Sequence, residues 1–430
     1  MSLMRKNTRN QLFATSFVLA LVLGCAPGVD ETGDAATRTA DAVPTVITNP
    51  APAGSGQPNL AAGAGGTFHL SWLVQAGEAH SLRSATLSPD GATWSAPGTA
   101  GTADTVFANW ADFPSVTELA DGSLVAHWLQ YLAPGKYSYG VLLARTTDGE
   151  WSEPWQPHDD SSPVEHGFVS VVAEPAGGFT AIWLDGRAFI DSDDAIATNE
   201  MSVRARRYDA DGTADDEQAL DLLVCDCCQT GAAMIGDVLV VAYRNRSPEE
   251  IRDIWTVRRT ADGWSEPAAV ANDGWMIPGC PVNGPMVVAT TANSGAVAWF
   301  ALVNDLPEVK VAFTHDSGAS FDDPILIERG TTESATLGRV GMASLGDGSV
   351  VVSWLTQRDN VGEIRYQRIA PDGAAGVVRV LATTGAARDS GFPRLAASNS
   401  HLLLAWTDTL GDTPAIRTAR LPLTALTDGS

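Results

Sequence analysis

The stretch SVVVSWL at residues 349–355 decides the fold, because close copies of it return along the chain at a nearly constant spacing. Each copy is a near-continuous apolar run ending in an aromatic residue, which is typical of a strand covered on both faces. The other copies are FHLSWLV (68–74), SLVAHWLQ (123–130), FTAIWLD (179–185), VLVVAYR (238–244), AVAWFAL (296–302) and HLLLAWT (401–407). Their aromatic residues follow one another at steps of 52 to 60 positions.

A period of this length holds four short strands and their turns, which is the size of one β-propeller blade. Seven copies therefore predict an all-β propeller of seven four-stranded blades, with a six-bladed ring as the alternative. The last unit stops after three strands, and the run VPTVITN (43–49) belongs to no blade. We expect this N-terminal strand to supply the fourth strand of the last blade and close the ring.

The composition supports a large folded core and limits the partners. The 430 residues are 44% hydrophobic and 18% charged, which argues against global disorder. Lys and Arg number 27 against 51 Asp and Glu, for a net charge of −24. Nucleic acid and anionic membrane surfaces are poor partners for such a field.

The N-terminal segment predicts export. A basic start (Arg5, Lys6 and Arg9) precedes an apolar run at 12–23 that is too short to span a bilayer as a helix. The run ends in Val-Leu-Gly-Cys at 22–25, which resembles the lipobox of bacterial lipoproteins. The resemblance implies cleavage before Cys25, lipidation of that cysteine, and anchoring to the outer membrane or cell surface through the lipid alone. An ordinary signal peptide and an uncleaved anchor are the alternatives.

The predicted domains follow from these assignments. They are a lipoprotein signal peptide (1–24), a flexible acidic tether (25–42), the propeller (43–424) and a C-terminal tail (425–430).

The turns between the third and fourth strands carry a family resemblance. THDSGASF (314–321) fits the Asp-box pattern, and SPDGATW (88–94) is a copy with one residue fewer. In such a turn an Asp side chain accepts backbone N–H bonds, Gly takes the left-handed conformation, and the aromatic residue packs between strands. The repeated boxes resemble those of the sialidase (BNR-repeat) superfamily. This supports the fold more than any activity, because the boxes lie on the face away from the active site.

Unusual residues gather where strand one begins and where strand two ends, on the opposite face at the mouth of the central channel. A cluster of guanidinium groups there could grip a carboxylate or another anion. The alternative is that these arginines pair with Asp185, Glu249, Glu250 and Asp253 to brace loops. The arginines concerned are Arg187, Arg244, Arg246, Arg252, Arg339 and Arg394.

The resemblance implies that three arginines hold a substrate carboxylate, and Arg339 and Arg394 occupy suitable positions for two of them. The sequence departs from the family in having neither an Arg-Ile-Pro motif in the first blades nor a clear Tyr–Glu nucleophile pair. Asp112 and Glu165 are the candidate catalytic carboxyls, since glycoside hydrolysis needs two. Asn109 and Trp110 could form a sugar-stacking platform, although Trp110 could equally be a core residue between blades.

Four cysteines are expected to lie close together, because they precede strand one of adjacent units. They are Cys225, Cys227, Cys228 and Cys280. Disulfides are one interpretation, either from the first cluster to Cys280 or as a strained bond between neighbours Cys227 and Cys228. A Cu(I) or Zn site with His166 as a further ligand is another, and free thiols are the third.

The sequence leaves three functions open. The leading one is a surface-anchored, sialidase-like propeller that recognises a carbohydrate or small anionic ligand at the channel mouth and acts as an exo-glycosidase. The others are an extracytoplasmic Cu- or Zn-binding protein and a non-catalytic interaction scaffold.

Overall fold

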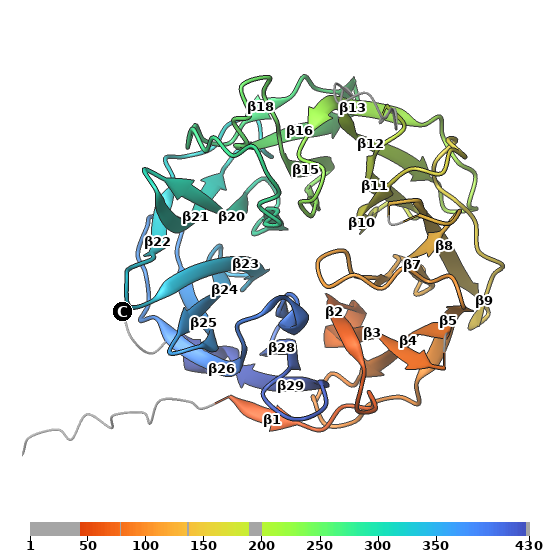
Figure 1. Cartoon of the computed structure of the whole chain (residues 1–430), viewed down its shortest axis with the longest axis horizontal. Helices are drawn as coiled ribbons and strands as arrows, with labels where there is room; N and C mark the ends of the chain where they lie inside the picture. The colour runs from red at the N-terminus through yellow and green to blue at the C-terminus, as the bar shows by residue number, and fades with distance from the viewer. Residues whose placement is uncertain (1–43, 78, 136, 189–199, 427–430) are drawn as a thin grey trace, which may run out of the picture. The chain divides into compact units, whose positions relative to one another are not determined.

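The computed structural model describes residues 44–77, 79–135, 137–188 and 200–426. The proposed signal peptide, the tether and Cys25 lie outside this range. Within it, seven antiparallel sheets are arranged as the blades of a β-propeller (Figure 1). The predicted all-β class and the count of seven blades are confirmed, and the six-bladed alternative is wrong.

The first blades follow one another along the chain, each with its strands in sequence order. Blade one contains β2 (Gly56–Ala62), β3 (Phe68–Ala76), β4 (Ala79–Leu87) and β5 (Gly98–Ala103). Blade two contains β6 (Ser115–Glu118), β7 (Leu124–Tyr131), β8 (Tyr139–Thr147) and β9 (Glu150–Trp151). Blade three contains β10 (His166–Ala173), β11 (Phe179–Asp185), β12 (Met201–Tyr208) and β13 (Gln218–Val224).

The next three blades repeat the pattern, except that a short extra strand also pairs with β16 in blade four. Blade four contains β14 (Gly231–Ile235), β15 (Val238–Arg244), β16 (Ile254–Thr260), β17 (Gly263–Trp264) and β18 (Ala268–Ala269). Blade five contains β19 (Met286–Ala289), β20 (Gly295–Val303), β21 (Leu306–Thr314) and β22 (Ile325–Arg329). Blade six contains β23 (Ala335–Ser344), β24 (Val350–Arg358), β25 (Val361–Ile369) and β26 (Arg379–Gly385).

Blade seven joins the two ends of the described chain, as predicted. It contains β27 (Arg394–Ala397), β28 (His401–Asp408) and β29 (Ala415–Pro422), and its fourth strand is β1 (Thr45–Ile47). Strand β1 pairs antiparallel with β29, with Val46 opposite Ala419. The exposed edge of β29 is thereby paired, and the ring is closed between the first and last strands.

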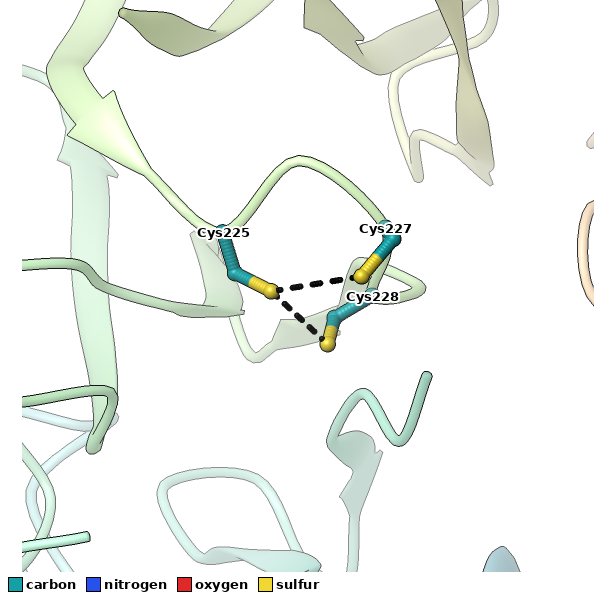
Figure 2. Close-up of side chains that lie close together, drawn as sticks. All are labelled: Cys225, Cys227 and Cys228. Carbon is teal, nitrogen blue, oxygen red and sulfur yellow. Dashed lines mark hydrogen bonds between the residues drawn. The ribbon is translucent and has the colours of Figure 1, made fainter. Parts of the chain in front are cut away.

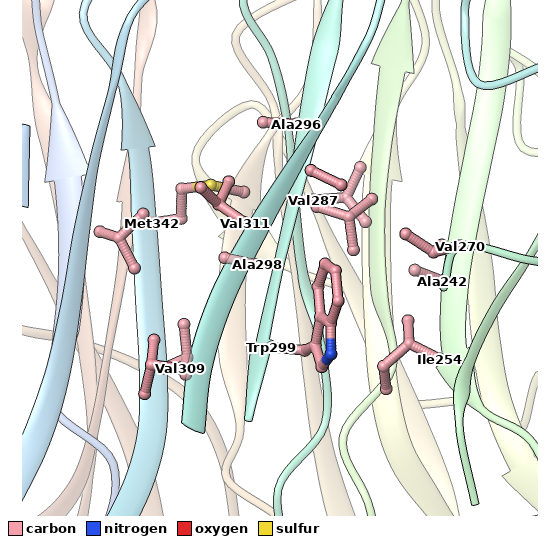
Figure 3. Close-up of a cluster of buried hydrophobic side chains, with 14 of the residues drawn as sticks. Ala242, Ile254, Val270, Val287, Ala296, Ala298, Trp299, Val309, Val311 and Met342 are labelled. Carbon is pink, nitrogen blue, oxygen red and sulfur yellow. The ribbon is translucent and has the colours of Figure 1, made fainter. Parts of the chain in front are cut away.

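The repeated aromatic residues form the core between blades. Trp72, Trp183, Trp299 and Trp354 are completely buried. Figure 3 shows Trp299 of β20 packed near Ile254 and Val270 of the neighbouring blade. The period of the sequence is therefore the period of the inter-blade packing, with each large ring filling the wedge between two sheets.

Helical structure in the described chain is limited to three short 3₁₀ turns. They are Ala64–Gly66, Arg388–Ser390 and Leu423–Leu426. None of the helices in the described residues is long and apolar enough to cross a membrane.

Candidate functional site

A cavity of about 260 Å³ lies on the propeller axis, lined by the first strands of six blades. The polar side chains around it include Asn59, Asp112, Gln229 and Arg394. Ligand pockets for drug-sized molecules usually measure roughly 300–1,000 Å³. This cavity therefore suits a small anion or one sugar ring and is too small for a polymer chain.

The segment that carries Asn109 and Trp110 packs across blades. The Trp110 ring stacks on Phe392 of the segment before β27, with centroids 5.8 Å apart. The Arg339 guanidinium lies 5.2 Å from the Trp110 ring centroid, and Gln229 donates to the Ala111 carbonyl at 2.6 Å. Asn109 accepts a hydrogen bond from the Ala111 N–H. These contacts favour the packing interpretation of Trp110, because its ring already lies against Phe392 and arginine.

Arg394 is the arginine that faces the axial cavity without a carboxylate partner in the described chain. Its Nε donates to Asn59 Oδ1 at 2.9 Å, and its guanidinium lies 4.7 Å from the Phe113 ring centroid. Burial lowers the pKa of Arg394 to about 10, so the group is still charged at neutral pH. Arg394 is half-buried, and a guanidinium whose contacts are an amide oxygen and a ring still has nitrogens that can bind an anion.

Arg339 is held by neutral groups alone. Its guanidinium donates to Ser390 Oγ at 2.7 Å and to the Gly391 and Ala387 carbonyls at 2.9 and 3.0 Å. Burial lowers the pKa of this arginine to about 10, and nearby Asp389 opposes the change. Arg339 therefore keeps its charge, but its hydrogen bonds are made to protein groups. This arrangement suits it to hold the segment before β27 in place more than to bind a ligand.

Three first strands carry a strained residue at the point where they approach the axis. Gln57, Phe168 and Arg339 have positive φ angles of 51°, 53° and 52°. Each lies at a register shift in β2, β10 or β23. Such bulges are over-represented next to functional sites, where they redirect side chains. The sequence reasoning missed them, although a glycine precedes all three residues and was an available signal.

Three of the other candidate arginines pair with carboxylates, as the alternative interpretation predicted for Asp185 and Glu250; ion pairs with Glu249 and Asp253 are not seen among the described residues. Arg187 bonds Asp185 and Glu217 at 2.7 and 2.8 Å. Arg246 and Arg252 both pair with Glu250, at 2.5 and 2.9 Å.

Arg244 is also structural, but it is satisfied by carbonyl oxygens. Its guanidinium donates to the carbonyls of Asn283, Arg252 and Phe300 at 2.6–3.0 Å. The side chain is buried and lies over the Trp275 ring. It ties the loop after β15 to blade five and leaves no nitrogen for a ligand.

The two candidate carboxyls lie in one buried cluster with a residue that sequence reasoning missed, Tyr139. The Tyr139 hydroxyl donates a short hydrogen bond to Glu165, and the Phe168 N–H donates to Asp112 Oδ2 at 2.8 Å. Burial raises the pKa of Glu165 to about 7, against the effect of the Tyr139 hydrogen bond. Burial and the nearby Glu165 raise the pKa of Asp112 well above its usual range.

Close approach of the backbone makes this cluster compact. A Cβ atom added at Gly167 would lie 2.2 Å from Asp112 Oδ2 and 3.1 Å from the Tyr139 ring. Tyr139 is the first residue of a third strand. Nothing in the sequence around it indicates that it is a partner of Glu165, so the sequence contains no signal for it. A tyrosine–glutamate pair therefore does exist in this fold, with Tyr139 buried beside Asp112.

The four candidate cysteines come together as expected. Cys227 is bonded to Cys280, which links the segment before β14 to the segment before β19. This confirms the predicted bridge between blades four and five and excludes the bond between Cys227 and Cys228. Cys225 and Cys228 remain as buried free thiols, with their Sγ atoms 3.0 Å apart (Figure 2).

His166 does not join the cysteines, so its expected role as a further sulfur-site ligand is wrong. Its Nε2 lies 3.1 Å from Asp160 Oδ2 and 3.7 Å from Asp185 Oδ2, and its ring stacks on His158 at 4.1 Å. With Cys227 in a disulfide, Cys225 and Cys228 offer the two thiols left for a metal. A tetrahedral Zn site needs more ligands than these.

A larger cavity, of about 1,170 Å³, lies away from the axis. It is bordered by turns and outer strands of the first three blades, with Trp151 and Trp155 among its residues. Its arginine is paired with a carboxylate, since Arg145 bonds Asp121 at 2.8 Å, whereas Arg394 in the axial cavity has no carboxylate partner among the described residues.

The sequence matches no protein-family model and no curated protein. Solved structures show a similar fold. A protein of unknown function from Dyadobacter fermentans has a TM-score of 0.51 and 16% identity, over 88% of this chain and 98% of its own. The polysaccharide lyase Uly1 has a TM-score of 0.50 and 8% identity, over 86% and 90%. NanB sialidase from Streptococcus pneumoniae has a TM-score of 0.45 and 11% identity, over 89% and 70%.

Identities this low establish the architecture alone. The chain is a seven-bladed β-propeller, and what it binds has to be argued from its own residues.

Proposed function

We propose that the propeller binds a carbohydrate or another small anionic ligand in the axial cavity, with Arg394 as the anchor for the anionic group. The observation that carries the proposal is the Arg394 guanidinium, which lines the cavity and has no carboxylate partner in the described residues. The fold is shared with a polysaccharide lyase, which is consistent with a sugar-related role.

The charge of the chain makes carboxylate partners plentiful. With 51 acidic residues against 27 basic ones, a guanidinium can readily find a carboxylate, as Arg187, Arg246 and Arg252 do. Arg394 instead contacts Asn59 and the Phe113 ring. An incoming carboxylate or sulfate would replace water around the two terminal nitrogens and form the charge-assisted pair that the protein does not supply.

The neighbouring acids extend the proposal to glycoside hydrolysis. Burial raises the pKa of Asp112 well above its usual range and that of Glu165 to about 7, and both changes favour the protonated form that a general acid requires. In this scheme Asp112, the acid that lines the cavity, donates its proton to the leaving oxygen, and Glu165 in the same cluster, when ionised, takes a proton from the water that attacks the anomeric carbon. The small cavity restricts such chemistry to a terminal sugar.

Titration calorimetry tests the binding step. We expect glucuronic acid or N-acetylneuraminic acid to bind the wild-type protein, and neutral N-acetylglucosamine to bind more weakly or not at all. Losing a charged hydrogen-bond donor costs about 1.5–3 kcal/mol, so Arg394→Gln should weaken binding roughly 10- to 100-fold. Arg394→Lys should lose less, and Arg145→Gln in the outer cavity is the matched control that should change nothing. Equal affinity in wild type and Arg394→Gln would exclude Arg394 as the anchor.

Release of a fluorophore from a sialoside or glucuronide tests the hydrolytic step separately. Asp112→Asn should abolish turnover while the calorimetric affinity of the sugar is kept. Binding without turnover in the wild-type protein would leave a recognition protein and remove the glycosidase.

Surface anchoring is proposed on sequence grounds, from the lipobox-like segment at 22–25. Metabolic labelling with a radioactive fatty acid should mark the wild-type chain in bacteria that process lipoproteins, and Cys25→Ser should remove the label. Equal labelling of both chains would overturn the anchor.

A further inference from the structure

A free thiol lies beside the disulfide of this protein. Cys225 Sγ is 3.0 Å from Cys228 Sγ and 3.8 Å from Cys227 Sγ, and Cys227 is bonded to Cys280. Figure 2 shows the Cys225 sulfur directed at the other two sulfurs of its segment. The attacking thiol and the disulfide that it would attack therefore lie in one loop, with Cys280 bonded to it.

The surroundings activate Cys225. Burial disfavours its thiolate, but the hydrogen bond with Cys228 and the charge of Arg252 outweigh burial and lower its pKa to about 7. The Arg252 guanidinium nitrogen lies 3.3 Å from Cys225 Sγ. Burial and Cys225 raise the pKa of Cys228 well above its usual range, so Cys228 remains a thiol. A thiolate is the attacking species in exchange, and a nucleophile whose pKa is close to ambient pH is the most effective.

Exposure differs along the same set of sulfurs. Cys225 and Cys228 are buried, Cys227 is partly exposed, and Cys280 is exposed. Cys280, the leaving group in an attack on Cys227, is therefore the sulfur of the set that solvent reaches most readily.

We propose that the four cysteines form a thiol–disulfide exchange site that moves the disulfide inward and presents the Cys280 thiolate to disulfide-bearing molecules in solvent. In the first step the Cys225 thiolate attacks Cys227 Sγ, the Cys225–Cys227 bond forms, and Cys280 leaves as a thiolate. In the second step Cys228 attacks Cys225 Sγ and gives its proton to the departing Cys227 sulfur, so that Cys227 leaves as a thiol. One disulfide has replaced another, so the internal exchange consumes no oxidant or reductant.

The exchange has a structural consequence. The Cys227–Cys280 bond joins the segments before the first strands of blades four and five. Its transfer to Cys225–Cys228 closes a bridge within one segment and unfastens the two blades at the channel end. The site thus couples disulfide exchange to the loop that carries Arg252.

Alkylation and peptide mapping test the proposal on the full chain carrying Cys25→Ser, so that four cysteines remain. The protein is reduced, reoxidised with one equivalent of diamide and labelled with N-ethylmaleimide. In this parent chain we expect two populations, one with a Cys227–Cys280 bond and one with a Cys225–Cys228 bond and with both Cys227 and Cys280 labelled. In a parallel sample that is not alkylated, 5,5′-dithiobis-(2-nitrobenzoic acid) should release its chromophore in proportion to the fraction of Cys280 that N-ethylmaleimide labels.

A pair of matched variants separates exchange from simple structure. Cys228→Ser keeps the nucleophile but lacks the second thiol, so it should trap the Cys225–Cys227 bond and leave Cys280 labelled. Cys225→Ser removes the nucleophile and should leave Cys280 protected, with labelling roughly tenfold lower, because Cys228 is scarcely ionised at neutral pH. Before the two variants are compared, circular dichroism should establish that both are folded.

Two results would overturn the proposal. One is equal protection of Cys280 in both variants. The other is stoichiometric Cu or Zn that shields Cys225 and Cys228 from labelling while the Cys227–Cys280 bond persists, which would instead establish a thiolate metal site.

Discussion

The pKa of Glu165 predicts how the stability of the propeller depends on pH. Burial raises this pKa from 4.5 to about 7, so between these values the folded state binds more protons than the unfolded state. The free energy of unfolding must then fall as pH rises through this window. Each pKa unit is worth about 1.4 kcal/mol, so the group contributes at most about 3 kcal/mol, present below pH 4.5 and lost above pH 7.

Glu165→Gln isolates that contribution. The amide oxygen can still accept the Tyr139 hydrogen bond but cannot ionise. Urea unfolding at a series of pH values should show variant and wild type alike near pH 4 and the variant more stable by about 3 kcal/mol at pH 8. Asp112 is present in both proteins, so its own titration largely cancels in the difference.

Glu174→Gln is the opposite control. Burial opposes ionisation of Glu174, but hydrogen bonds from Thr180, Arg259 and Arg207 lower its pKa. Its contribution is therefore present at neutral pH and lost on acidification, so this variant should be less stable at pH 7 and approach wild type in acid. Parallel pH profiles for wild type and Glu165→Gln would refute the raised pKa.

Three further changes test the packing. Gly167→Ala should destabilise by about 1–3 kcal/mol because its Cβ would meet Asp112, whereas Gly98→Ala, whose Cβ meets nothing within 4 Å, should be neutral in chemical denaturation. Trp354→Ala should cost about 3–5 kcal/mol in the same assay, since this completely buried ring leaves a large cavity. Truncation before residue 50 removes three paired residues of β1 and should cost about 3 kcal/mol at roughly 1 kcal/mol per hydrogen bond, and truncation before residue 44 is its control. A melting temperature unchanged by the longer truncation would contradict ring closure by β1.

The architecture was predictable because the residues that repeat along the sequence are the residues that pack between neighbouring blades. A period marked by Trp72, Trp183, Trp299 and Trp354 is visible in one dimension, and so is the incomplete last unit that β1 completes. The bridge between Cys227 and Cys280 followed from the same reasoning, since topology places their segments in adjacent blades.

The site was only partly predictable, because pairing is decided by side-chain contacts between segments far apart in sequence. Arg187 and Arg394 look alike in sequence, yet Arg187 bonds two carboxylates and Arg394 none in the described chain. His166 was expected beside the cysteines and instead lies against Asp160. Tyr139 gave no signal, because its importance comes from a contact with Glu165 that only the folded sheets create.

A crystal structure with bound glucuronic acid tests the central claim most directly. The account predicts the sugar in the axial cavity with its carboxylate on the terminal nitrogens of Arg394, and loss of that density in Arg394→Gln crystals. Sugar bound instead in the outer cavity beside Trp151 and Trp155, or an axial cavity that stays free of sugar when the ligand is saturating, would contradict it.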